Sequence, residues 1–155
     1  MEIKSEQFLN PQTSFLGVNG VRKLAKEIVK WEETLGKEDT KKILKSVVEF
    51  CGTVPTTPNK LKGISEKDNI SFVASRDKMS KVLIELGNEY QNDNIKNAGC
   101  LFEESGKCFE KLCDIFIKYL LDEENDIKTS RDILLNIADI EYRAYELISK
   151  GIKEI

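Results

Sequence analysis

The stretch from Ala98 to Leu121 constrains the fold more than any other part of the sequence. Most of its apolar residues recur in steps of three, four and seven, which places them on one face of an α-helix. They are Ala98, Leu101, Phe102, Cys108, Phe109, Leu112, Phe116 and Leu120. Cys113, Ile117 and Leu121 widen this face beyond what contact with one neighbouring helix requires. The pattern predicts the central helix of an all-α bundle, with other segments packed on two sides of it.

Four further segments show helical spacing of apolar residues, and no segment alternates as a strand would. They are expected at about 20–35, 39–51, 70–90 and 129–150. Short polar residues that can accept a hydrogen bond from unpaired backbone amides stand at three of their starts: Asn19, Asp39, and Thr129 or Ser130. Glycine follows two of them, at Gly36 and Gly151, as it often does at a helix C-terminus.

The apolar faces of these segments define the expected core. The first face is Val21, Leu24, Ala25, Ile28 and Trp31. The second is Ile43, Leu44, Val47, Val48, and Phe50 or Cys51. The third is Phe72, Val73, Met79, Val82, Leu83, Leu86 and Tyr90. The last is Ile133, Leu134, Ile137, Ile140, Ala144, Tyr145 and Ile148.

Residues 52–63 separate the second and third segments. Two prolines, two glycines and three threonines predict a loop. A loop of this length is uncommon in a compact domain and is often functional. Its amides, with Lys60 or Lys62, could hold a phosphate, but the sequence does not match a phosphate-binding loop and favours a plain surface loop. Because no repeat or domain boundary is evident, residues 1–155 are expected to form a single all-α domain of about five helices.

Composition excludes two classes of partner. The chain has 24 basic and 27 acidic side chains, a net charge of -3, and no block of lysine or arginine, so we expect no nucleic-acid partner. The longest apolar run, residues 115–121, is far shorter than the ~20 residues that span a bilayer, so no membrane partner is expected. The N-terminus lacks a signal-peptide pattern, which favours a cytoplasmic location.

The cysteines and the absence of histidine restrict the possible chemistry. Cys51, Cys100, Cys108 and Cys113 form no C-x-x-C pair, so the sequence favours reduced thiols in a core and neither a metal nor a cofactor is expected. Without histidine the chain lacks the commonest general base and the Ser-His-Asp and Cys-His nucleophile pairs. An enzyme would need carboxylates, lysine or arginine instead, and the adjacent Glu103 and Glu104 point about 100° apart on a helix. They are expected on a solvated face.

The order of features resembles a known family. Gly17-Val18-Asn19-Gly20-Val21-Arg22-Lys23-Leu24-Ala25-Lys26-Glu27-Ile28, followed by Trp31, is similar to the opening of the helical C-terminal domain of butirosin biosynthesis protein H-like proteins. In that family a second helix, a Gly-rich loop, an Arg-containing helix and a long helix come next. Here residues 52–63 stand at the loop, Arg76 at the arginine, and residues 101–105 in the long helix. The sequence departs from the family at residues 55–58, Pro-Thr-Thr-Pro, where consecutive glycines are usual.

The resemblance implies an accessory role. Family members carry a papain-like N-terminal domain with a cysteine nucleophile, and the named member transfers an acyl group from an acyl carrier protein to an aminoglycoside amine. None of the four cysteines matches that nucleophile. The resemblance implies a non-catalytic domain that completes a substrate pocket or docks a carrier protein, beside a papain-like acyltransferase domain in cis or in trans. The candidate ligand or partner contacts are Thr56, Thr57, Lys60 and Arg76.

An alternative hypothesis needs no enzyme relative. The wide apolar face of the central helix and the aromatic pair Tyr142 and Tyr145 also suit a helical interaction module that forms a homodimer or binds another protein. For Arg76 the sequence leaves open a ligand contact, a surface position or an ordinary salt bridge.

Overall fold

The computed structural model describes residues 17–51, 72–123 and 127–155, with the side chains of residues 49–51 excluded. These ranges contain five α-helices and no strand, which confirms the all-α prediction. The helices are α2 (Val18–Leu35), α3 (Lys37–Cys51), α4 (Phe72–Glu89), α5 (Asp93–Leu120) and α6 (Lys128–Glu154). The predicted loop at residues 52–63 lies outside the described residues.

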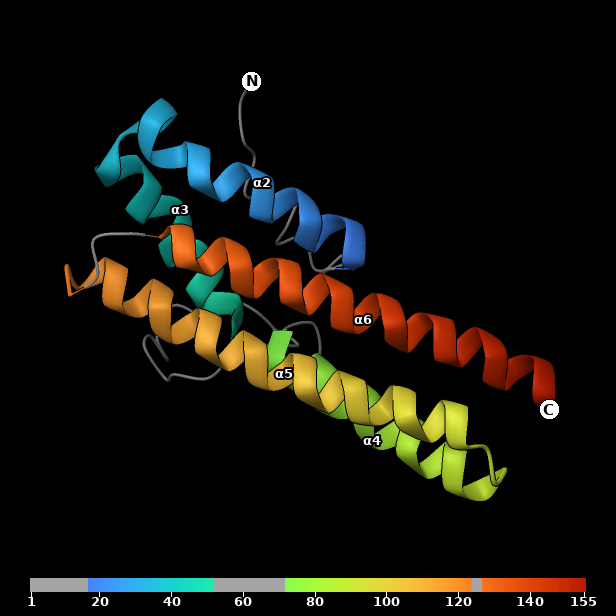
Figure 1. Cartoon of the computed structure of the whole chain (residues 1–155). Coiled ribbons are helices and arrows are strands. Elements are labelled where there is room, and N and C mark those ends of the chain that lie inside the picture. Colours follow the sequence, from blue (N-terminus) through green and yellow to red (C-terminus); the bar gives the residue numbers. More distant parts are fainter. Residues whose placement is uncertain (1–16, 52–71, 124–126) are drawn as a thin grey trace.

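Helix α5 lies at the centre of the arrangement, as the sequence predicts. α4 runs along its N-terminal half and α3 contacts it nearer its C-terminus (Figure 1). α6 runs antiparallel to α5, and α2 lies on α6. One end of the molecule therefore consists of α4, α5 and α6, and the other of α2, α3, α5 and α6.

Two clusters of buried apolar side chains form the core. The larger comprises Val21, Leu24, Ala25, Ile28, Trp31, Leu44, Val47, Val48, Phe72, Phe109, Leu112, Cys113, Phe116, Tyr119, Ile127, Leu134, Ile137 and Ala138. The smaller comprises Leu83, Ile95, Ala98, Phe102 and Ala144. The predicted face of residues 20–35 is buried in full. On α5 the predicted face is buried or half-buried, except that Leu121 follows the helix end and is exposed.

Two predicted N-caps lie inside helices. α2 begins at Val18 with Gly17 in the N-cap position, so Asn19 lies in its first turn. α3 begins at Lys37, directly after Gly36, which places Asp39 in its first turn. α3 starts this early because Gly36 alone separates it from α2: Gly36 adopts φ 83°, a conformation that glycine reaches without strain.

Both ends of α6 also differ from the prediction. Ile127 occupies the N-cap position, and the hydroxyl of Ser130 donates back to the Ile127 carbonyl within the first turn. Gly151 lies inside the helix and does not follow it. It is buried where α6 crosses the start of α5: a Cβ at Gly151 would lie 2.5 Å from Cγ1 of Ile95. This glycine therefore permits a close helix contact and does not end the helix.

The face of α4 differs most from the prediction. Of the predicted face, Phe72 and Leu83 are buried, as predicted, and Val73 and Met79 are half-buried. Val82 and Leu86, and Tyr90 directly after the helix, are instead 44%, 36% and 55% exposed. The buried residues of α4 also include three that the sequence does not predict: Arg76, Ser80 and Gly87. α4 is turned in this way because it approaches α5 over small residues. A Cβ at Gly87 would lie 2.6 Å from a backbone nitrogen of α5. The predicted apolar row is thus partly left at the surface.

The cysteines do not form the uniform set of core thiols that the sequence favours. Cys113 is buried and disulfide-bonded, Cys100 is free and exposed, and Cys108 is free and half-buried. Because disulfides persist mainly in oxidising compartments, the cysteines do not support a cytoplasmic location. Among the described helices, none is both long and apolar enough to cross a bilayer.

Candidate functional site

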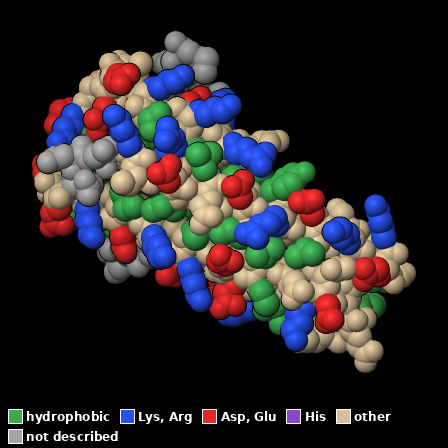
Figure 2. Space-filling model, viewed as in Figure 1, with side chains coloured by type: hydrophobic (Ala, Val, Ile, Leu, Met, Phe, Trp, Pro, Cys, Tyr) green, Lys and Arg blue, Asp and Glu red, His purple; other side chains and the backbone are tan. Residues whose placement is uncertain are grey.

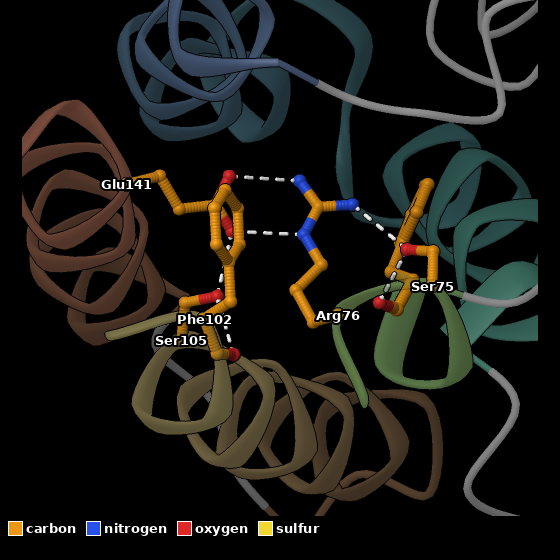
Figure 3. A network of polar contacts seen from close by, with 6 residues as sticks. Ser75, Arg76, Phe102, Ser105 and Glu141 are labelled. Carbon is orange, nitrogen blue, oxygen red and sulfur yellow. Dashed lines mark hydrogen bonds and ion pairs between the residues drawn. The ribbon is translucent and has the colours of Figure 1, made fainter. Parts of the chain in front are cut away.

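A buried ion pair joins α4 to α6 in the middle of the molecule. The guanidinium of Arg76 donates from Nε to Oε2 of Glu141 at 2.8 Å and from Nη2 to Oε1 at 2.9 Å. Both side chains are 0% exposed. Figure 3 shows the two side chains meeting between the helices, with α5 below them. The planar fork of arginine matches a carboxylate in this two-bond arrangement, which lysine cannot reproduce.

Neighbouring groups satisfy the rest of this network. The Ser105 hydroxyl of α5 donates to Oε2 of Glu141 at 2.6 Å. Nη1 of Arg76 donates to the Ser75 hydroxyl oxygen at 3.1 Å, and the Phe109 ring centroid lies 4.7 Å from the guanidinium carbon. A buried charge is tolerated only when paired and hydrogen-bonded, and both charges here meet that condition.

The network lies between the two apolar clusters. On each of its three helices the polar residue separates a member of the larger cluster from a member of the smaller one. Arg76 stands between Phe72 and Leu83 on α4, Ser105 between Phe102 and Phe109 on α5, and Glu141 between Ala138 and Ala144 on α6. The network therefore links the three helices at fixed positions. Because its side chains bond to one another, none of them is free to act on a substrate.

The sequence prediction identifies one member of this network. For Arg76 the sequence leaves open a ligand contact, a surface position or a salt bridge. In the structure Arg76 is buried, so it is not at the surface, and it forms a salt bridge with a carboxylate of the same chain. Ser105 and Glu141 were not predicted. Both interrupt an apolar helical face at its centre, a signal the sequence does contain. A charged residue there needs a buried partner, and Arg76 carries the matching charge.

The other predicted contacts Thr56, Thr57 and Lys60 lie outside the described residues. Glu103 and Glu104 are exposed, as expected, and Glu103 lies 3.8 Å from Lys107 in an ion pair. Within the described ranges no three histidine, cysteine, aspartate or glutamate side chains gather so that they could hold a metal ion. On the face that Figure 2 shows, acidic and basic side chains are interspersed.

A second polar cluster ties the C-terminal end of α5 to α2 and α3. The buried Tyr119 hydroxyl donates to Oε1 of Glu32 at 2.5 Å. Burial, then the nearby Glu32 carboxylate, raises the pKa of Tyr119 well above its usual range. Asp122 lies 2.5 Å from Nζ of Lys41 and 3.7 Å from Nζ of Lys37. Its hydrogen bond with Lys41 lowers the pKa of Asp122 and raises that of Lys41.

An open surface cleft of about 500 Å³ lies between α5 and α6. It is lined by Asn97, Cys100, Leu101, Arg143, Glu146, Leu147 and Lys150. A smaller cleft of about 140 Å³ between α4 and α5 is lined by Val73, Asp77, Glu103, Gly106, Lys107 and Glu110. The larger one has the size typical of small-ligand sites, about 300–1,000 Å³.

Comparison with known proteins gives no relative: the chain matches no family, no curated protein and no solved structure.

Proposed function

We propose that this chain is a non-catalytic helical accessory domain that binds a papain-like acyltransferase domain, in cis or in trans, and helps it to hold its substrate or carrier protein. The observation that carries the proposal is the position of the residues behind the resemblance. Gly17 opens α2, Trp31 is buried in the larger cluster, and Arg76 is buried between the clusters. The shared features are those that build a scaffold.

The buried network supports a binding role over a catalytic one. Arg76 and Glu141 are fully paired and closed to solvent, so neither is placed to exchange a proton with a substrate. A network in which every member has a partner makes a core rigid and specific. The chain would then act through its surface.

The test is complex formation. Light scattering on a mixture of this chain with a papain-like acyltransferase domain should show a particle heavier than either component, and the rate of acyl transfer should change with it. Arg76→Met disturbs the scaffold and should abolish both effects, while the exposed Arg131→Met should leave them intact. The absence of any complex, together with a native polypeptide of 17.7 kDa in the cells that make it, would refute the proposal in both forms.

A specific observation favours self-association as a second candidate. An apolar row is exposed on α4 and directly after it: Val82 and Leu86 on the helix, and Tyr90 after its end. Exposed lysines, Lys78 and Lys81, precede Val82, and exposed glutamates, Glu85 and Glu89, come after it. Lys81 also lies 3.0 Å from Asp77 of its own helix, in an exposed ion pair. Two antiparallel copies of α4 would bring the lysines of one against the glutamates of the other, which is the self-complementary pattern of a two-fold dimer.

Of the two features that suggest self-association in the sequence, the apolar face of α5 does not support it in the structure, and the aromatic pair supports it only through Tyr142, which is 50% exposed. The wide apolar face of α5 is covered by the chain's own helices, and Tyr145 is half-buried with its ring 5.6 Å from that of Phe102. The α4 row is tested by sedimentation equilibrium. A dimer should dissociate in Leu86→Lys, while Leu135→Lys, at a position of similar exposure on α6, should remain dimeric. A parent chain that is monomeric at high concentration would refute this candidate.

A further inference from the structure

The cleft between α5 and α6 has features of a binding site that the proposed function does not use. Both of its walls come from helices that the larger and smaller apolar clusters hold in place, and α4 contributes no residue to its lining. Its lining includes Leu101 and Leu147, which are half-buried and pack against the smaller cluster. The cleft therefore offers an apolar surface on a rigid support.

Two cations face this apolar surface. Arg143 and Lys150 stand seven residues apart on α6, which is two helical turns or about 10 Å along the axis. Among the described residues no ion pair within 4.0 Å joins either of them to a carboxylate. Glu146 between them leaves the lining with a net positive charge, and the amide of Asn97 adds a donor and an acceptor on the opposite wall.

We propose that this cleft binds a small organic anion, one that carries a carboxylate or phosphate head on a short apolar chain. The head would pair with Arg143, whose planar guanidinium can donate two hydrogen bonds to it, and with Lys150 as a second charge. The apolar chain would lie on Leu101 and Leu147. This inference does not depend on the partner proposed above.

Cys100 supplies a reporter at the site itself. Its thiol lines the cleft and is exposed and free. Cys108, on the same helix but outside the cleft, is half-buried, and burial raises the pKa of its thiol, so it reacts more slowly. Cys113 is disulfide-bonded. A bound ligand should therefore slow modification of Cys100 and leave Cys108 unchanged.

The experiment measures the rates of disulfide exchange of the two thiols with Ellman's reagent on the full chain. The probes are sodium hexanoate and hexyl phosphate, with hexanol, hexylammonium and inorganic phosphate as comparisons. Hexanoate or hexyl phosphate should slow Cys100 several-fold and leave Cys108 unaffected, while the three comparison compounds should have no such effect. The double variant Arg143→Gln/Lys150→Gln should weaken binding about ten-fold or more, since charge-assisted hydrogen bonds to the head are lost.

Matched controls separate this site from general effects. Lys118→Gln/Arg131→Gln removes two exposed cations that are not in the cleft and should bind the probes as the parent chain does. Because nearby cations also change thiol reactivity, each variant is compared with itself, with and without probe. Equal protection by hexanol or inorganic phosphate, equal loss in both double variants, or no protection of Cys100 by either anionic probe would overturn the proposal.

Discussion

Removing Arg76 tests the central claim about the interior of this bundle. Arg76→Met keeps the length and much of the apolar contact of the side chain but removes its charge. Glu141 then loses the two hydrogen bonds at 2.8 and 2.9 Å and keeps only the one from Ser105. Because both partners are 0% exposed, water cannot replace the lost donors without opening the core.

The expected loss of stability is large. Breaking a buried ion pair by removing one partner costs about 3–5 kcal/mol, since the remaining charge is left without compensation. That is a substantial share of the roughly 5–15 kcal/mol by which folded domains are stable. With a denaturant slope of about 2 kcal/mol per molar urea, the unfolding midpoint should fall by about 2 M.

The double variant Arg76→Met/Glu141→Leu separates an unpaired charge from lost contacts. Replacing both charges with apolar side chains of similar volume is often neutral or stabilising, so most of the lost free energy should return. Arg131→Met is the control, because its ion pair with Asp132 is exposed and long at 3.7 Å, and it should change stability by less than about 1 kcal/mol. Urea unfolding followed by the fluorescence of Trp31 gives all values. A cost below about 1 kcal/mol for Arg76→Met would refute the reasoning.

Further predictions concern helix contacts and titration. Gly99→Ala should lower the free energy of unfolding by about 1–3 kcal/mol, because the new Cβ would lie 2.8 Å from an α4 side chain and 2.9 Å from an α4 carbonyl oxygen. Gly106→Ala, whose nearest contact would be at 3.4 Å, should leave that free energy unchanged or raise it by up to about 1 kcal/mol. Thermal unfolding measures both. In an alkaline absorbance titration Tyr119 should ionise after the other tyrosines, because its pKa is raised. Its contribution to the stability of the fold is therefore present below about pH 10 and is lost as the pH rises towards the folded pKa. Ionisation together with the other tyrosines would contradict this. Since the pKa of Asp122 is lowered, its pairing with Lys41 stabilises the fold above about pH 4, and this is lost as the pH falls through the pKa of Asp122 in the folded state. In NMR titrations Asp122→Asn should lower the pKa of Lys41, and an unchanged pKa would contradict the contact.

The helices and most of the core could be predicted because they depend on local spacing. The 3.6-residue period places Trp31 and its neighbours on one face whatever they pack against. Helix ends were predicted less accurately: Gly36 ends α2 as predicted, but Gly151 lies inside α6, because a glycine is compatible with several positions at or near a helix end. Only the tertiary contact of Gly151 with Ile95 decides that α6 continues past it.

The face of α4 could be predicted only in part from its own sequence: Phe72 and Leu83 are buried as predicted, but other members of the predicted face are exposed. Val82, Leu86 and Tyr90 have the same helical spacing as the residues that are buried, and they are more apolar than Arg76 or Ser80. Burial of the polar set depends on groups far away in the sequence: the carboxylate of Glu141, 65 residues on, and the small residues of α5. Apolar periodicity predicts which residues prefer a core, but a charge with a buried partner can turn the helix.

The Arg76–Glu141 pair therefore does more than satisfy two charges. α4 packs on α5 and α5 on α6, while α4 and α6 approach each other closely at few points, so this pair is a direct link between them. Shifting α4 by one turn would bring Ser80 or Phe72 opposite Glu141 and leave that carboxylate unpaired, which is costly in a core. The double apolar variant should regain stability yet lose this discrimination between registers. Its amide NMR spectrum should then show more than one set of signals for α4, and a single sharp set would show that the small residues of α5 fix the register unaided.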